Sequence, residues 1–161
     1  EEVVVLPNSR NVVMAAQAAA DLARKPVRVV ASAAQQAGLI GALSFDPGRT
    51  AAENAAAIAA SLTGLRTGQV APAARADAGG RFGVGEAVGY VGDELVAWGE
   101  PAATLRTVLE RLAADAELVT VIAGDGAPLD GAAVEGLAPD GVELELATGG
   151  QPSRWWLLSA E

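Results

Sequence analysis

Residues 3–11 have the sequence VVVLPNSRN, and this stretch decides the fold class of the chain. The apolar run from Val3 to Leu6 is typical of a buried strand, and the polar turn after it leads into a helix over 12–23. Pro26 ends that helix, and residues 27–31 form a second apolar strand. Strands that alternate with helices pair in parallel, so the stretch predicts an α/β fold with a mixed, partly parallel sheet flanked by helices.

The alternation of single strands with helices changes after residue 65. Arg66-Thr67-Gly68 is the expected seam, so we expect two small lobes, a first α/β lobe over 1–66 and a second over 67–161. Thr50-Ala51-Ala52-Glu53 has the form of a capping box at a helix start, and Gly92-Asp93 predicts a tight hairpin turn. Pro72 places its strand at a sheet edge. The other expected elements are helices over 35–43, 102–114 and 129–137, and strands over 70–74, 86–91, 94–98, 118–123, 142–146 and 155–159.

Composition excludes several classes of partner and location. The chain has 161 residues, and its 11 basic and 20 acidic residues give a net charge of −9, which repels nucleic acid and anionic lipid surfaces. No apolar run approaches the roughly 20 residues of a membrane span. Cysteine is absent, which suits a cytoplasmic location. Because the chain opens on a strand without a methionine, we expect it to be part of a larger protein.

The residue types needed for most covalent chemistry are missing. Histidine and cysteine are both absent, which excludes Ser-His-Asp triads, Cys-His pairs and histidine zinc sites. Carboxylates can hold magnesium, but we expect the acids to be solvated and to bind no metal, because no spacing gathers them. These acids, in turns or at strand ends, are Asp77, Glu86, Asp93, Glu94 and Asp125. The chain is therefore expected to act by binding.

The first candidate binding residues are Asn8, Arg10 and Asn11, at the end of the first strand. Open α/β sheets place ligands at such strand ends, and the amides of a helix N-terminus can hold an anion there. The alternative is that Asn8, Ser9 or Asn11 only caps the helix and Arg10 points to water.

The second candidates lie near the end of the chain. Trp155 and Trp156 are neighbours in a strand, so their side chains point to opposite faces. One can anchor a partner while the other is in the core, or the strand can be buried on both faces. Gln151, in the turn before this strand, completes the candidate binding set.

Four motifs occur in order along the whole chain. They are VVLPNSRNV at 4–12, Gly38-Leu39 followed by Phe45-Asp46-Pro47, RTGQV at 66–70, and GGQP at 149–152. Together they resemble the C-terminal domain of the bacterial fatty acid kinase catalytic subunit, which is dihydroxyacetone kinase-like and is also labelled Dak phosphatase domain protein. The resemblance implies a fold related to DegV proteins and dihydroxyacetone kinase substrate domains. The chain departs from it at residues 34–37, where AQQA replaces a Ser-Ile-Pro-Gln-like stretch.

The resemblance also implies a function. In that family an N-terminal domain binds ATP and magnesium, a middle domain follows, and the C-terminal portion is implicated in docking a DegV-like subunit that presents a fatty acid carboxylate for phosphorylation. This chain would then be a non-catalytic C-terminal docking domain without a cofactor of its own. Its partners would be the kinase and middle domains of an ATP-dependent parent, together with the DegV-like subunit.

Two alternatives stay open. The chain could be a glycerone-like small-molecule-binding domain of a kinase, although the dihydroxyacetone domain holds its substrate through a histidine that this chain lacks. It could instead be a structural domain that forms a homodimer.

Overall fold

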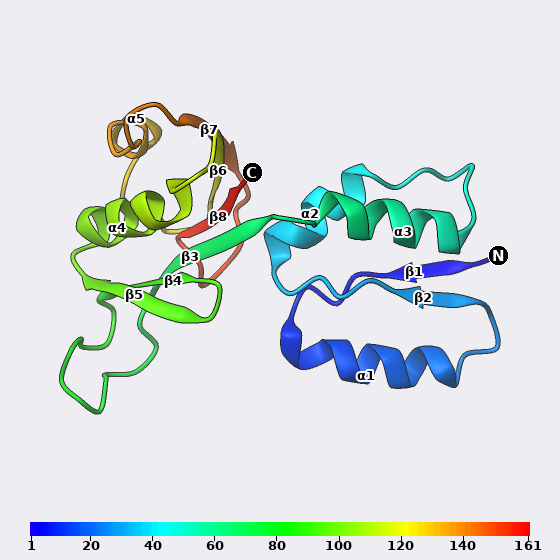
Figure 1. The fold of residues 1–161 in the computed structure, drawn as a ribbon. Helices are drawn as coiled ribbons and strands as arrows, with labels where there is room; N and C mark the ends of the chain where they lie inside the picture. Colours follow the sequence, from blue (N-terminus) through cyan, green and yellow to red (C-terminus); the bar gives the residue numbers. More distant parts are fainter. The chain divides into compact units, whose positions relative to one another are not determined.

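The computed structural model describes residues 1–161 and divides into two compact units, Glu1–Leu65 (unit 1) and Arg66–Glu161 (unit 2) (Figure 1). The boundary lies one residue before the expected one. Both parallel and antiparallel strand pairs are present, with helices against the sheets, so the predicted mixed α/β class is confirmed. None of the helices combines the length and hydropathy that crossing a bilayer requires.

Unit 1 is a small three-layer arrangement. Strands β1 (Val3–Val5) and β2 (Val27–Val29) form a two-stranded parallel sheet. Helix α1 (Arg10–Asp21) lies on one side of it, and α3 (Ala51–Ser61) on the other (Figure 1). Helix α2 (Gln35–Leu43) packs against α3. The capping box of α3 forms as predicted, since the Thr50 hydroxyl accepts from the Glu53 amide while the Glu53 carboxylate accepts from the Thr50 amide at 2.9 Å.

Unit 2 contains a six-stranded sheet in the order β5-β4-β3-β8-β6-β7. All neighbouring strands are antiparallel except the parallel pair β6 and β7. The elements are β3 (Arg66–Pro72), β4 (Ala87–Val91), β5 (Glu94–Gly99), α4 (Pro101–Ala113), β6 (Leu118–Ala123), α5 (Gly131–Glu135), β7 (Glu143–Thr148) and β8 (Trp156–Ala160). The last strand of the sequence therefore lies in the middle of the sheet.

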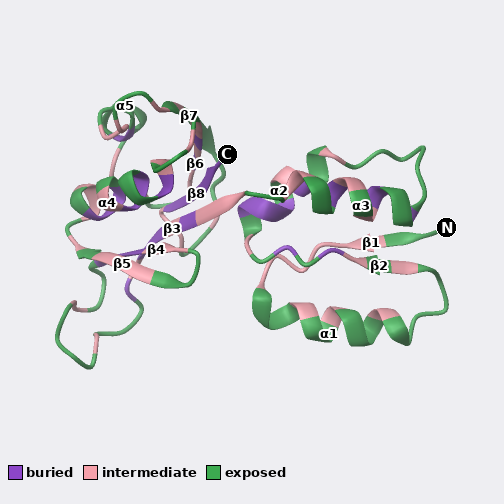
Figure 2. Cartoon of the chain, viewed as in Figure 1, coloured by how far each residue is buried: buried purple, intermediate pink, exposed green.

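The core of unit 2 forms where α4 packs on β3, β4 and β5. Four apolar side chains of α4 have no exposed surface, and Figure 2 shows this buried face of the helix. They are Leu105, Val108, Leu109 and Leu112. A Cβ on Gly68 or Gly89 would lie less than 3 Å from α4 side chains, so glycine at these two positions allows the close approach.

The seam expected at Arg66-Thr67-Gly68 lies at the boundary between the two units, and these residues form the start of β3. The expectation about Pro72 is wrong. The strand that carries Pro72 is not at an edge, because it lies between β4 and β8. Proline is tolerated there because it is the last residue of β3, beyond the pairing with β8, which ends at Val70.

Candidate functional site

Asn8 is the centre of the loop between β1 and α1. Its φ of 56° lies in the left-handed region, which asparagine tolerates better than most residues. Ser32 is fully buried, and its hydroxyl donates to Asn8 Oδ1 at 2.7 Å. The same hydroxyl accepts from the backbone N–H of Asn8 at 2.9 Å. A Cβ on Gly38 would lie 2.0 Å from the same Oδ1. Asn8 therefore links its loop to the segment after β2 and to α2.

The other two predicted residues of this loop are on the surface. Arg10 and Asn11 are exposed in the first turn of α1. Ser9 is the N-cap residue, but its side chain makes no capping hydrogen bond. The structure thus places Asn8 in an internal hydrogen-bond link, whereas Arg10 and Asn11 are exposed on α1.

Gln151 shapes the turn that leads into β8. Its side-chain amide donates to the carbonyl oxygens of Ile122 at 3.1 Å and Arg154 at 3.4 Å. Its own carbonyl accepts from the Asp125 amide at 3.0 Å. These contacts are all within the chain, and they fix the backbone from which the Arg154 side chain extends.

The two tryptophans differ in their exposure. Trp156 has no exposed surface and belongs to the core of unit 2, so it cannot anchor a partner. Trp155 is half-buried, and its ring meets that of Trp156 edge to face with the centroids 6.1 Å apart. Trp155 alone keeps surface that a partner could contact.

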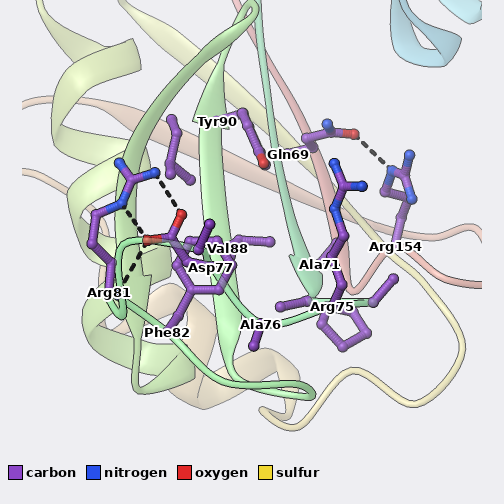
Figure 3. A pocket seen from close by; sticks show the side chains of 15 residues that line it. Gln69, Ala71, Arg75, Ala76, Asp77, Arg81, Phe82, Val88, Tyr90 and Arg154 are labelled. Atoms are coloured by element: carbon purple, nitrogen blue, oxygen red, sulfur yellow. Dashed lines mark hydrogen bonds and ion pairs between the residues drawn. The ribbon is translucent and has the colours of Figure 1, made fainter.

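A cavity of about 660 Å³ lies in unit 2 on the sheet face away from α4 (Figure 3). On β3 and β4, Gly68 and Gly89 face α4, so the alternating neighbours Gln69, Val88 and Tyr90 face the cavity. The loop over 73–86 between these strands supplies most of the remaining wall. We call this the arginine cavity, because Arg75, Arg81 and Arg154 line it.

One of the three arginines is neutralised. Arg81 Nη2 lies 2.8 Å from Asp77 Oδ1, and Arg81 Nε donates to Asp77 Oδ2 at 3.0 Å. These hydrogen bonds from Arg81 lower the pKa of Asp77 to about 2. The Arg81 guanidinium also lies 5.3 Å from the ring centroid of Trp98 and 5.9 Å from that of Phe82. In the view of Figure 3 this pair occupies the side of the cavity opposite Arg75 and Arg154.

The other two arginines keep their charge available. Arg154 Nε donates to the neutral Gln69 Oε1 at 2.7 Å, and Arg154 Nη1 donates to the Ser153 carbonyl at 3.0 Å. Neither Arg154 nor Arg75 forms an ion pair with a carboxylate. Two unneutralised guanidinium groups in a chain of net charge −9 make this cavity suited to an anion.

None of the residues that line this cavity was predicted from the sequence as a site residue, and the polar ones missed include Gln69, Arg75, Tyr90 and Arg154. Gln69 and Arg154 are 85 positions apart, and only the antiparallel pairing of β3 with β8 brings them together. A signal was present, because Gln69 lies in the RTGQV motif and Arg154 follows the GGQP motif by two residues. No three acidic side chains gather where they could hold a metal ion.

Unit 1 exposes several large apolar side chains. Leu39 and Leu43 lie four residues apart on α2, so they share one face of the helix, and they are 57% and 88% exposed. Phe45, two residues after Leu43, is 50% exposed. We call Leu39, Leu43 and Phe45 the α2 patch. On α1, Met14 is also largely exposed.

The model of the FakA-like C-terminal family, which is named for a fatty acid kinase, matches residues 1–161. The chain belongs to this family. Its relatives include proteins of Staphylococcus aureus strains USA300 and N315 that are described as uncharacterized, each 30% identical over 167 residues. The match covers 98% of this chain and 30% of each relative, so the chain spans about a third of their length.

Solved structures of DegV family proteins have the same fold. The protein from Eubacterium eligens, loaded with heptadecanoic acid, matches 100% of this chain and 73% of its own with a TM-score of 0.64 and 17% identity. The Corynebacterium glutamicum protein matches 99% of this chain and 75% of its own, with a TM-score of 0.61 and 14% identity. A fatty-acid-binding DegV protein from Thermus thermophilus matches 99% of this chain and 71% of its own, with a TM-score of 0.58 and 14% identity. The predicted relation to the DegV fold is confirmed.

Proposed function

We propose that this chain is the docking domain of a fatty acid kinase. It binds a separate DegV-like, fatty-acid-binding protein in the cytoplasm and holds the acyl carboxylate within reach of an ATP-binding domain of the parent protein. The family supports this proposal, since it is named for a fatty acid kinase. In this proposal ATP and magnesium bind to other domains of the parent protein.

The exposed α2 patch is the observation that carries the proposal. A leucine that is 88% exposed gains about 1.5–3 kcal/mol when a partner covers it fully. Leu39 shares a helix face with Leu43, and Phe45 follows two residues later at 50% exposure. Exposed apolar side chains of this kind supply the central anchors of protein interfaces. The predicted contacts Arg10 and Asn11 lie on the surface of the same unit, where they would form polar contacts with the same partner.

The proposal is tested by calorimetry with the fatty-acid-loaded DegV-like protein of the same organism. Leu43→Asp is expected to weaken binding by at least about tenfold, because a carboxylate would be buried against an apolar partner surface. The matched control is Val84→Asp, since Val84 is 71% exposed but lies in the 73–86 loop of unit 2, and this change should leave the affinity unaltered.

Two outcomes would contradict docking through the α2 patch. One is saturable binding that Leu43→Asp and Val84→Asp leave equally intact. The other is no binding at about 1 mM, the weakest affinity that a useful docking contact would have.

A homodimer would use the same apolar surface, so the structural alternative needs its own measurement. Sedimentation velocity of the chain alone separates the two functions. A dimer that Leu43→Asp converts into a monomer would favour the structural role, whereas a monomer that associates only when the DegV-like protein is added favours docking.

A further inference from the structure

We propose that the arginine cavity is a binding site for a small amphipathic anion, that is, a carboxylate or phosphate joined to an apolar group. This inference does not depend on docking, because the cavity belongs to unit 2 and the α2 patch to unit 1. It rests on three features: the charge of the cavity, the fixed position of Arg154, and the mixture of polar and apolar wall residues.

The charge of the cavity is positive although the chain as a whole is acidic. Asp77 is the only acidic residue in the wall, and it is paired with Arg81. Arg75 and Arg154 thus contribute two positive charges that no carboxylate balances. Guanidinium groups bind carboxylate and phosphate oxygens through paired hydrogen bonds, so an oxyanion is the complementary ligand group.

Arg154 is held in position before any ligand arrives. Gln69 and the Ser153 carbonyl accept two of its five N–H groups, and Gln151 holds the Arg154 carbonyl. Three N–H groups of the guanidinium remain for an anion. A donor fixed in this way loses little conformational entropy on binding, which favours affinity.

The rest of the wall suits an apolar group next to the anion. Ala71, Val88 and Leu95 line the cavity beside the hydroxyl-bearing Tyr90. A volume of about 660 Å³ lies within the range of small-molecule sites, which combine apolar walls with a few polar groups. An acidic side chain of a protein partner would satisfy the arginines alone, so the size and lining favour a small molecule over a peptide.

Calorimetry of the whole chain tests the site with four probes. Hexanoate and hexyl phosphate carry both groups, hexanol lacks the anion, and inorganic phosphate lacks the apolar chain. We expect one of the two amphipathic anions to bind saturably and more tightly than hexanol and inorganic phosphate. Which of the two binds more tightly identifies the oxyanion as carboxylate or phosphate. Raised ionic strength should weaken this binding, because the attraction is partly screened.

Variants locate the binding. Arg75→Gln and Arg154→Gln should each weaken binding of the preferred amphipathic anion about tenfold. Arg106→Gln, at an exposed position of α4 outside the cavity, should have no effect. Arg75 makes no hydrogen bond or ion pair within the chain, so its variant tests the site without disturbing the fold.

Four results would overturn the proposal. If hexanol binds as tightly as the amphipathic anions, the arginines do not contribute to binding. If inorganic phosphate binds as tightly as they do, the apolar wall does not contribute. Affinities unchanged in both variants would place any binding elsewhere. If none of the four probes binds but Arg154→Gln weakens binding of the DegV-like protein, the cavity receives an acidic side chain of that protein instead.

Discussion

The two units differ in how much apolar surface they bury. Unit 2 closes the whole apolar face of α4 against its sheet and buries the central strand β8 completely. In unit 1 only Val30, Ala37, Ala51 and Ile58 are buried apolar residues, and α1 has no buried residue. A two-stranded sheet supplies little core. The difference indicates that unit 2 is stabilised by its own interior, whereas unit 1 leaves more of its apolar surface exposed.

The largest expected effect contrasts one side chain from each unit. Trp156→Ala should lower the free energy of unfolding by about 3–5 kcal/mol, because it empties the core of unit 2. Leu43→Ala should change it by less than about 0.5 kcal/mol, because Leu43 is mostly exposed. Urea unfolding of both variants measures the difference. A loss of several kcal/mol at Leu43 would mean that the chain covers this residue in solution, and would break the contrast.

The next effect concerns the internal link of unit 1. Gly38→Ala should destabilise the chain by about 1–3 kcal/mol, because its Cβ would overlap Asn8 Oδ1. Asn8→Gly keeps the left-handed backbone allowed and removes the obstructing side chain. In the Asn8→Gly background, Gly38→Ala should therefore cost much less, and thermal unfolding of the four proteins of this double-mutant cycle measures the coupling. Additive effects would show that Gly38 is required for another reason.

This link also shows what the sequence predicts and what it leaves out. The strand, the turn and the helix around Asn8 follow from local apolar patterns, and Thr50-Ala51-Ala52-Glu53 predicts its capping box because both partners lie within four residues. Local patterns do not predict that Asn8 contacts Ser32 and Gly38, because these contacts depend on how β2 and α2 pack. Asn8 therefore looks like a helix cap or ligand contact in the sequence, but it forms an internal hydrogen-bond link.

The arginine cavity was not predictable for the same physical reason. Its two unneutralised guanidinium groups come from a loop and from the segment just before the last strand, and strand order decides that these meet. The sequence pattern predicted Trp155 and Trp156 in one strand with their side chains on opposite faces, but β8 begins at Trp156 and the two rings meet edge to face. Only the central position of β8 decides that Trp156 is the fully buried one. The residues of the cavity come together through long-range strand pairing. Local sequence patterns do not reveal this pairing, so they predicted other residues as the site.

A smaller effect distinguishes two helix starts within unit 1. Thr50→Ala should destabilise unit 1 by about 0.5–2 kcal/mol, because it removes the capping box of α3. Ser9→Ala should have almost no effect, because the Ser9 side chain makes no capping hydrogen bond at α1. Chemical denaturation followed by circular dichroism measures both. Equal losses would show that Ser9 caps α1 in solution.

The smallest expected effect concerns the titration of Asp77 in the 73–86 loop of unit 2. Hydrogen bonds from Arg81 lower the pKa of Asp77 from 3.8 to about 2, so the native state favours the ionised carboxylate. The contribution of this pair to stability is complete above pH about 4 and is lost as the pH falls through about 2. Carboxyl carbon chemical shifts in NMR should give a midpoint near the lower value in the native chain. In the Arg81→Gln variant the midpoint should move back towards 3.8, since the first cause of the shift is removed. A midpoint that stays low in Arg81→Gln would mean that the backbone amides of residues 79 and 81, not the guanidinium group, hold Asp77 in its ionised form.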